Sequence, residues 1–129
     1  RVDESTVLSA LDLFPTLARL AGAAAPPSPD GEDMSAALLG RPRRRAKDLF
    51  WEYGRAEQGY PYPGLARDRS PNCAIRSGPW KLLQNADGSR AELYHLGRDP
   101  RESQPVSNSR VENRLRRKLS AWRNSLPAI

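Results

Sequence analysis

The sequence predicts an α+β domain, in which an antiparallel sheet of about four strands carries a C-terminal helix packed on it. Two observations support this prediction. Between residues 73 and 96, three runs rich in β-branched, aromatic and Leu residues are separated by turn sequences at residues 77–79 and 86–89, which indicates two consecutive hairpins. From residue 109 onward, apolar residues recur at steps of three and four, as they do on one face of a helix.

A separate helix is predicted ahead of the sheet, over residues 13–21. Asp12 stands at its N-cap position, where a carboxylate can accept hydrogen bonds from the free amides of the first turn. Pro15 is compatible with that first turn, because the N–H that it lacks would have no partner there. Gly22 is expected to end the helix in the left-handed conformation. Almost all other positions are apolar, so this helix needs partners on two sides, and we expect a larger upstream domain to supply one of them.

The chain between the first helix and the sheet contains a connector, a short helix and one strand. Residues 23–29 are a Pro-rich connector, which we take as the boundary between residues 1–29 and residues 30–129. Asp33 can cap a brief helix that Gly40 ends. Residues 48–53 alternate as a strand, with Leu49, Trp51 and Tyr53 on one face.

Residues 54–72 have no helical or strand period and are predicted to form a long loop. Loops of this length are usually functional or disordered. Arg and Tyr side chains in and beside it supply donors that suit an anionic or hydroxylated ligand. The residues that we predict at a substrate rim are Trp51, Arg55, Tyr60, Tyr62 and Arg67. The alternative interpretation of the same loop is a flexible surface excursion.

The C-terminal helix is predicted to begin at a capping box formed by Ser109 and Glu112. Pro127 is expected to end it. Its apolar stripe, which should lie across one face of the sheet, consists of Val111, Leu115, Leu119, Trp122 and Leu126.

Basic residues exceed acidic ones by 21 − 15, which gives the formal net charge of +6. They concentrate in residues 41–47 and on the last helix. Such a balance can indicate a nucleic-acid or polyanion partner, but exposed charge of this kind usually only solvates a surface. Both interpretations stay open at this point. No run of residues has the length and apolar character of a membrane span.

The chain offers few groups for catalysis, and we predict no catalytic residue and no metal ligand in it. Cys73 is the single cysteine and begins a strand, where a buried apolar role is expected. His95, the single histidine, lies within a strand and is expected to have a hydrogen-bonded packing role. No carboxylates fall at a spacing that would hold a metal or divide acid and base roles.

Six short segments follow one another in an order and spacing that carry a family resemblance. Two of them read Ala74-Ile-Arg-Ser-Gly-Pro-Trp-Lys-Leu-Leu83 and Glu92-Leu-Tyr-His-Leu96. The others are residues 11–22, residues 30–31 with 38–40, residues 49–53 and residues 99–102. In these segments the chain resembles the C-terminal part of a type I sulfatase of the alkaline-phosphatase superfamily. Residues 70–71, 85–90, 96–100 and 119–122 resemble the N-acetylgalactosamine-6-sulfatase-like branch.

The resemblance implies hydrolysis of sulfate esters by a formylglycine, made from the Cys of a Cys-x-Pro-Ser-Arg motif, beside a calcium ion. Cys73-Ala-Ile-Arg-Ser lacks the Pro of that motif, so Cys73 is not expected to be modified. We therefore expect no cofactor in this chain, and calcium and formylglycine in an upstream α/β catalytic domain. Residues 1–29 would be the tail end of that domain, and residues 30–129 would be the C-terminal subdomain.

The implied role of the subdomain is to cover the catalytic domain and to shape the rim of a pocket for a sulfated carbohydrate or aryl sulfate. By itself the chain is expected to be inactive. The resemblance further implies a periplasmic or secreted location, no membrane partner and no nucleic acid. His95 departs from the Asp that many relatives carry at this position. Two alternatives are a basic module that binds nucleic acid or sulfated polyanions, and an interaction domain without a ligand.

Overall fold

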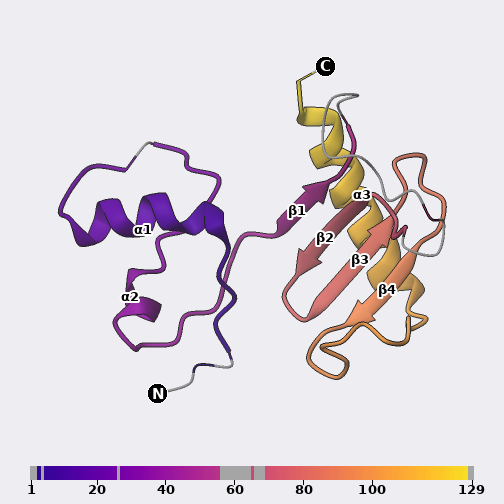
Figure 1. Cartoon of the computed structure of the whole chain (residues 1–129), viewed down its shortest axis with the longest axis horizontal. Helices are drawn as coiled ribbons and strands as arrows, with labels where there is room; N and C mark the ends of the chain where they lie inside the picture. Colours follow the sequence, from indigo (N-terminus) through magenta and orange to yellow (C-terminus); the bar gives the residue numbers. More distant parts are fainter. Residues whose placement is uncertain (1–2, 4, 26, 56–64, 66–68, 128–129) are drawn as a thin grey trace. The chain divides into compact units, whose positions relative to one another are not determined.

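The computed structural model describes residues 3, 5–25, 27–55, 65 and 69–127. The chain divides into two compact units, Arg1–Lys47 and Asp48–Ile129, and each is described by itself. The first unit contains the helices labelled α1 and α2 in Figure 1, and the second contains the sheet and α3. The predicted assignment of residues 1–29 and 30–129 to different domains of a longer protein is a separate matter, and it stays a prediction.

The first unit begins with a 3-10 turn, η1 (Ala10–Asp12), that leads into α1 (Leu13–Leu20). Pro15 is the third residue of α1, and Gly22 follows the helix at a φ of +70°, both as the sequence predicts. The predicted N-cap at Asp12 is wrong. Ser9 caps the turn instead, and Asp12 reaches back to accept from the Ser9 amide at 2.8 Å, because the 3-10 turn moves the start three residues earlier.

Asp12 also anchors the segment that follows α1. Its carboxylate is buried, accepts from the Glu32 amide at 2.8 Å and is ion-paired with Arg45. Glu32 in turn accepts from the amides of Ala46 and Lys47. Gly31 lies so close to the backbone of η1 that an added Cβ would be 2.0 Å from the Leu11 carbonyl oxygen. Residues 30–47 therefore belong with α1 in one compact unit.

The short helix α2 (Ser35–Leu38) lies where the sequence predicts it, and Gly40 follows at a φ of +83°. Its N-cap residue is Met34 and not the predicted Asp33, although Asp33 accepts from the Ser35 amide at 2.8 Å. α1 buries Pro15 and Thr16, and Thr16 Oγ1 accepts from the Met34 amide at 2.8 Å. The side chains that α1 leaves exposed are its large apolar ones, Leu13, Phe14, Leu17 and Leu20.

The second unit is built on an antiparallel sheet whose strand order is β1-β2-β3-β4. The strands are β1 (Leu49–Glu52), β2 (Cys73–Ser77), β3 (Trp80–Gln84) and β4 (Glu92–His95). Gly78 and Gly88 adopt φ values of +57° and +83° in the two turns that the sequence predicts, where other residues would be strained. The predicted α+β class and four-stranded meander are confirmed.

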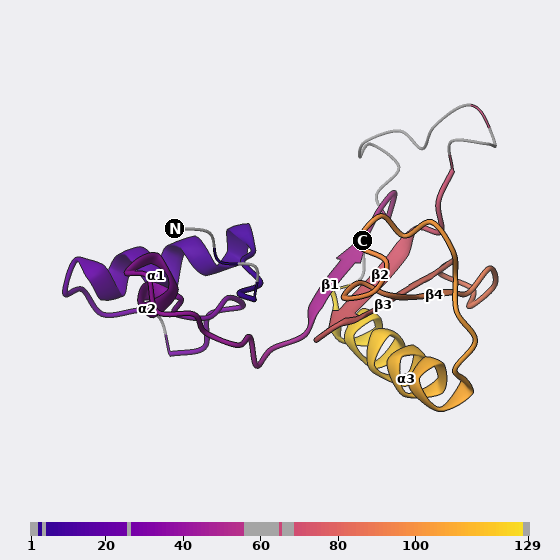
Figure 2. The same cartoon turned by 90° about the horizontal axis from the view of Figure 1, so that it is seen from below.

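α3 (Ser109–Ser125) lies across one face of this sheet, as Figure 2 shows. Ile75, Leu82 and Leu93 occupy neighbouring register positions on that face and pack with Leu115 and Leu119 of the helix. These five side chains are almost fully buried, and they form the core together with Cys73. The predicted apolar stripe of the helix is thus the surface that the sheet buries.

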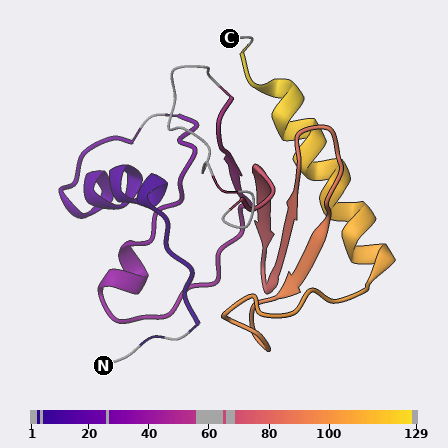
Figure 3. The same cartoon turned by 45° about the vertical axis from the view of Figure 1, so that its right-hand side comes forward.

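The predicted capping box of α3 is displaced by one residue. Ser109 is already helical, and the capping side chain is Asn108, whose Oδ1 accepts from the Val111 amide at 3.1 Å. Glu112 does not reach back to the cap and binds Arg116 Nε at 2.9 Å instead. The helix is reached from β4 through residues 96–108, which run along one end of the sheet in Figure 3.

Candidate functional site

The end of β1 carries the first predicted rim residue, Trp51. Side chains alternate along a strand, so Trp51 and Phe50 lie on opposite faces of the sheet. Phe50 faces α3, where it stacks on Trp122 with a centroid distance of 5.0 Å and an interplanar angle of 11°. Trp51 therefore lies on the face that α3 does not cover, and 47% of its surface is exposed.

Arg55, the second predicted rim residue, is held by contacts on the α3 side. Its Nη1 donates to Glu52 Oε2 at 3.2 Å, and its Nη2 donates to the Pro127 carbonyl oxygen at 2.8 Å. The Glu52 side chain is buried and also accepts from Arg123 Nε at 2.8 Å, which raises the pKa of Arg123. The structure thus places Trp51 and Arg55 toward different faces and does not bring them together.

The other predicted rim residues, Tyr60, Tyr62 and Arg67, lie outside the described residues. The base of the loop that contains them is closed, because the Tyr53 amide donates to the Asn72 carbonyl oxygen at 2.8 Å. Tyr53 is 42% exposed and shares the face of Trp51, so it is a further candidate for the rim that the loop-based prediction did not include. The signal that could have found it is the alternation of β1. The rim assignment as a whole stays a prediction.

Cys73 has the buried apolar role that the sequence predicts. It is 1% exposed within the core, and burial raises the pKa of its thiol. A thiol that is both buried and protonated is a poor nucleophile. The only hydrogen-bond partner found for it in the described part of the chain is Asn72 Oδ1, at 3.8 Å.

His95 packs as predicted but lacks the predicted hydrogen bond. Its ring meets Trp80 edge-on, with a centroid distance of 4.6 Å and an interplanar angle of 80°. Its Nδ1 is buried and has no hydrogen-bond partner in the part of the chain that the structure describes. The backbone of His95 is engaged in the turn that follows β4, because its carbonyl oxygen accepts from the amides of Arg98 and Asp99, each at 2.9 Å.

Neither a metal-binding cluster nor a membrane-spanning helix is found among the described residues. No three His, Cys, Asp or Glu side chains gather there in a way that could hold a metal ion. The helices of the described segments also lack the length and apolar character that a membrane crossing needs.

Comparisons with known proteins connect this fold to one enzyme class. No family model matches the chain. Arylsulfatase G of Mus musculus is 32% identical to it over 92 residues, which are 70% of this chain and 16% of that protein. Two solved structures, each 23% identical, cover 88% of this chain and 23% of theirs. They are BT4656 in complex with its substrate D-glucosamine-2-N,6-O-disulfate, at a TM-score of 0.60, and BT1596, a 2-O GAG sulfatase, at 0.55.

This chain has the sequence and fold of the C-terminal part of a sulfatase. It spans about a sixth of the length of the curated relative and about a quarter of the solved structures that it matches. The resemblance seen in the sequence motifs is thereby confirmed at the level of the class.

Several basic residues of this sulfatase segment bind acidic or carbonyl groups inside their own unit. Arg45 is buried against Asp12, although it lies in the basic segment 41–47 that was expected to be solvated or to bind a polyanion. On α3, Arg116 binds Glu112 and the Gly88 carbonyl oxygen, and Lys118 binds Asp48. These contacts do not favour the polyanion-binding alternative, because paired charges are less available to an outside partner.

Proposed function

We propose that this chain is the C-terminal subdomain of a sulfatase that hydrolyses sulfuric esters of sugars, and that its catalytic residues lie outside the chain. The observation that carries the proposal is the 32% identity to Arylsulfatase G over 70% of this chain. The fold shared with a protein solved with its substrate D-glucosamine-2-N,6-O-disulfate supports a sulfated carbohydrate as the substrate class. Residues in this chain act by covering the catalytic domain and lining the rim of its pocket.

We place formylglycine and calcium in the proposed catalytic domain, and the described residues of this chain carry no acidic cluster for a metal ion. Cys73 is buried, its thiol is protonated, and no acidic cluster stands beside it in the described segments. We therefore assign no catalytic step to this chain. The finer assignment to the N-acetylgalactosamine-6-sulfatase-like branch is also proposed, on the sequence segments described above.

Two exposed aromatic side chains, Trp51 in β1 and Tyr53 directly after it, are part of the proposed rim. Trp51 and Tyr53 offer flat apolar surface on one face, which suits the face of a sugar ring. Arg55 is proposed to support the rim from the α3 side through Glu52, and the loop that contains Tyr60, Tyr62 and Arg67 completes it.

The test is turnover of a chromogenic aryl sulfate and of a 6-sulfated hexosamine, measured with the longer protein that contains this chain and with residues 1–129 alone. We expect turnover by the longer protein and none by the chain alone. The Cys73→Ala variant of the longer protein should keep its kcat, because Cys73 is not the modified residue. Turnover by the isolated chain that survives chelation and Cys73→Ala, or a longer protein inert toward every sulfate ester, would overturn the proposal.

A further inference from the structure

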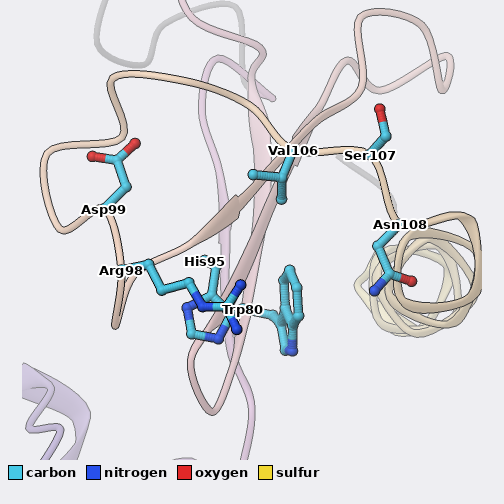
Figure 4. Close-up of a pocket in the computed structure, with 7 residues that line it drawn as sticks. All are labelled: Trp80, His95, Arg98, Asp99, Val106, Ser107 and Asn108. Carbon is cyan, nitrogen blue, oxygen red and sulfur yellow. The ribbon is translucent and has the colours of Figure 1, made fainter.

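A cavity of about 200 Å³ lies beside β4, at the opposite edge of the strand order from the rim residues of β1. It is formed where the start of β3, the end of β4 and the segment leading to α3 meet, as Figure 4 shows. Its lining residues are Trp80, His95, Arg98, Asp99, Val106, Ser107 and Asn108.

The apolar walls of the cavity are fixed by the sheet. Trp80 and His95 are register partners on β3 and β4, and their rings meet edge-on at 4.6 Å. Val106 is held in place because its amide donates to the carbonyl oxygen of Leu93 in β4 at 2.7 Å. This hydrogen bond fixes the segment leading to α3 against β4. The aromatic and aliphatic surfaces are therefore formed before any ligand arrives, so binding would cost little ordering.

The cavity contains a cation without a partner. The Arg98 guanidinium makes no hydrogen bond or ion pair within the described segments. Asn108 uses its Oδ1 to cap α3, which leaves its amide nitrogen free to donate. Figure 4 shows the Arg98 side chain extending toward the side chains of His95 and Trp80.

Asp99 is the acidic residue in the lining, and it does not neutralise these donors. Its carboxylate accepts from the Gln104 amide at 3.0 Å, the Ser103 amide at 2.7 Å and the Ser103 hydroxyl at 3.1 Å. These hydrogen bonds, with that of Gln104 foremost, hold the pKa of Asp99 below its usual value. The Asp99 carboxylate is therefore hydrogen-bonded within the turn that contains it, whereas Arg98 faces the cavity.

We propose that this cavity binds one anionic sugar unit, with the ring against Trp80 and its carboxylate or sulfate on Arg98. The cavity is smaller than the roughly 300–1,000 Å³ typical of sites for drug-sized ligands, which suits a single ring. The Trp80 ring suits the apolar face of a hydroxylated sugar ring, and the guanidinium of Arg98 suits an anionic group at one end of that sugar. The site rests on this geometry alone. In a sulfatase such a site would add avidity for an acidic polysaccharide.

The experiment is a titration followed by the amide, indole and guanidinium signals of Trp80 and Arg98 in ¹H–¹⁵N NMR spectra. The probes are D-glucuronate, glucose 6-sulfate, neutral D-galactose and inorganic sulfate. We expect at least one of the two anionic sugars to shift the cavity signals, with about tenfold weaker binding of galactose and of inorganic sulfate. The stronger of the two anionic sugars identifies the anionic group.

The matched pair of variants is Arg98→Ala and Arg101→Ala, which remove the same charge from two exposed positions of one loop. Arg98→Ala should weaken sugar binding about tenfold or more, and Arg101→Ala should leave it unchanged. Equal weakening by both variants, equal binding of inorganic sulfate, or no shift at the cavity with either anionic sugar would overturn the proposal. Turnover of sulfate esters is not used in this test, so a failure of the proposed sulfatase activity would be seen separately.

Discussion

Asp12 illustrates how one carboxylate can be kept charged in a buried position. Burial alone would raise its pKa, but the hydrogen bond from Arg45 and the amides of Glu32 and Ser9 outweigh that effect and lower it. The same residue thus caps η1, anchors residues 30–47 and neutralises Arg45. Removing either charge would leave the other buried without its partner.

The first prediction concerns Arg45→Ala. We expect it to destabilise the Arg1–Lys47 unit by about 3–5 kcal/mol, because the Asp12 carboxylate then loses its buried ion pair. Arg44→Ala, at an exposed neighbouring position, is the control and should change stability by less than about 0.5 kcal/mol. The measurement is hydrogen exchange of the Glu32 and Met34 amides, both of which bond to side chains of this unit. Unchanged protection in Arg45→Ala would refute the role assigned to the pair.

The same exchange measurement has a defined pH dependence. A carboxylate with a lowered pKa adds stability that is present above the unfolded pKa of about 3.9 and is lost as the pH falls through the lower folded value. Protection of the Glu32 amide should therefore be constant at neutral pH, after correction for intrinsic exchange, and decrease below about pH 4. In Asp12→Asn this acid-induced decrease should be smaller. A decrease that persists at full size in Asp12→Asn would assign it to other groups.

The second prediction concerns the reactivity of Cys73. Because the thiol is buried and its pKa is raised, we expect a thiol reagent at pH 8 to label the native chain slowly and the urea-unfolded chain rapidly. The labelling rate should rise with urea in parallel with the loss of the fold. Rapid labelling under native conditions would mean that Cys73 is accessible and would reopen a reactive role for it.

At the scale of the element, two neighbouring candidates for the N-cap of α3 can be distinguished by mutation. Asn108→Ala should cost about 1 kcal/mol, because the Val111 amide loses its acceptor. Ser109→Ala should be close to neutral, because Ser109 is already helical and Ala is the better helix former. The free energies of unfolding come from urea titrations followed by Trp fluorescence. A larger loss in Ser109→Ala than in Asn108→Ala would restore the capping box predicted from the sequence.

The caps of η1 and α3 show which features can be predicted from a sequence. The turns at Gly78 and Gly88 and the stripe of α3 follow from local rules, namely positive φ and periodicity, and they were predicted correctly. The choice between neighbouring capping residues depends on which residue leaves the helical backbone conformation. The conformation of the chain that leads into the helix decides this choice, so the residue types at Asp12 and Ser109 could not identify the true caps.

Contacts between distant residues account for the features that the sequence did not disclose. Arg45 finds Asp12 across 33 positions, so residues 41–47 read as a solvated basic run until the fold is known. The cavity likewise needs Trp80, His95 and Arg98 to meet Asn108 at the start of α3. Alternation along β1 predicts the face on which Trp51 lies, but the contact of Arg55 with Pro127 joins residues 72 positions apart. No local pattern encodes such pairings.

At the scale of the whole molecule, the formal net charge of +6 does not show which basic side chains are available to a partner, because each internal ion pair removes one charge of each sign. Arg45, Arg116 and Arg123 each bind carboxylates inside their own unit. Other basic side chains are exposed and make no hydrogen bond or ion pair within the described segments, among them Arg43, Arg44, Arg114 and Arg117. They are divided between residues 41–47 and α3, and thus between the two units.

The last prediction follows from this distribution and concerns nucleic acid. Duplex DNA bound through Z phosphates loses affinity with a log–log salt slope of about −0.9Z, so a few dispersed arginines give weak binding that disappears at moderate salt. We expect no binding of a 20-base-pair duplex at about 150 mM NaCl by fluorescence anisotropy, and a shallow slope below that concentration. Replacing Arg114 and Arg117 by Ala should change the slope by no more than about 2. A steep slope with tight binding at 150 mM NaCl, flattened by changes in residues 41–47, would instead establish the basic-module alternative. It would mean that a chain with the fold of a sulfatase C-terminal part also recognises a polyanion through charge.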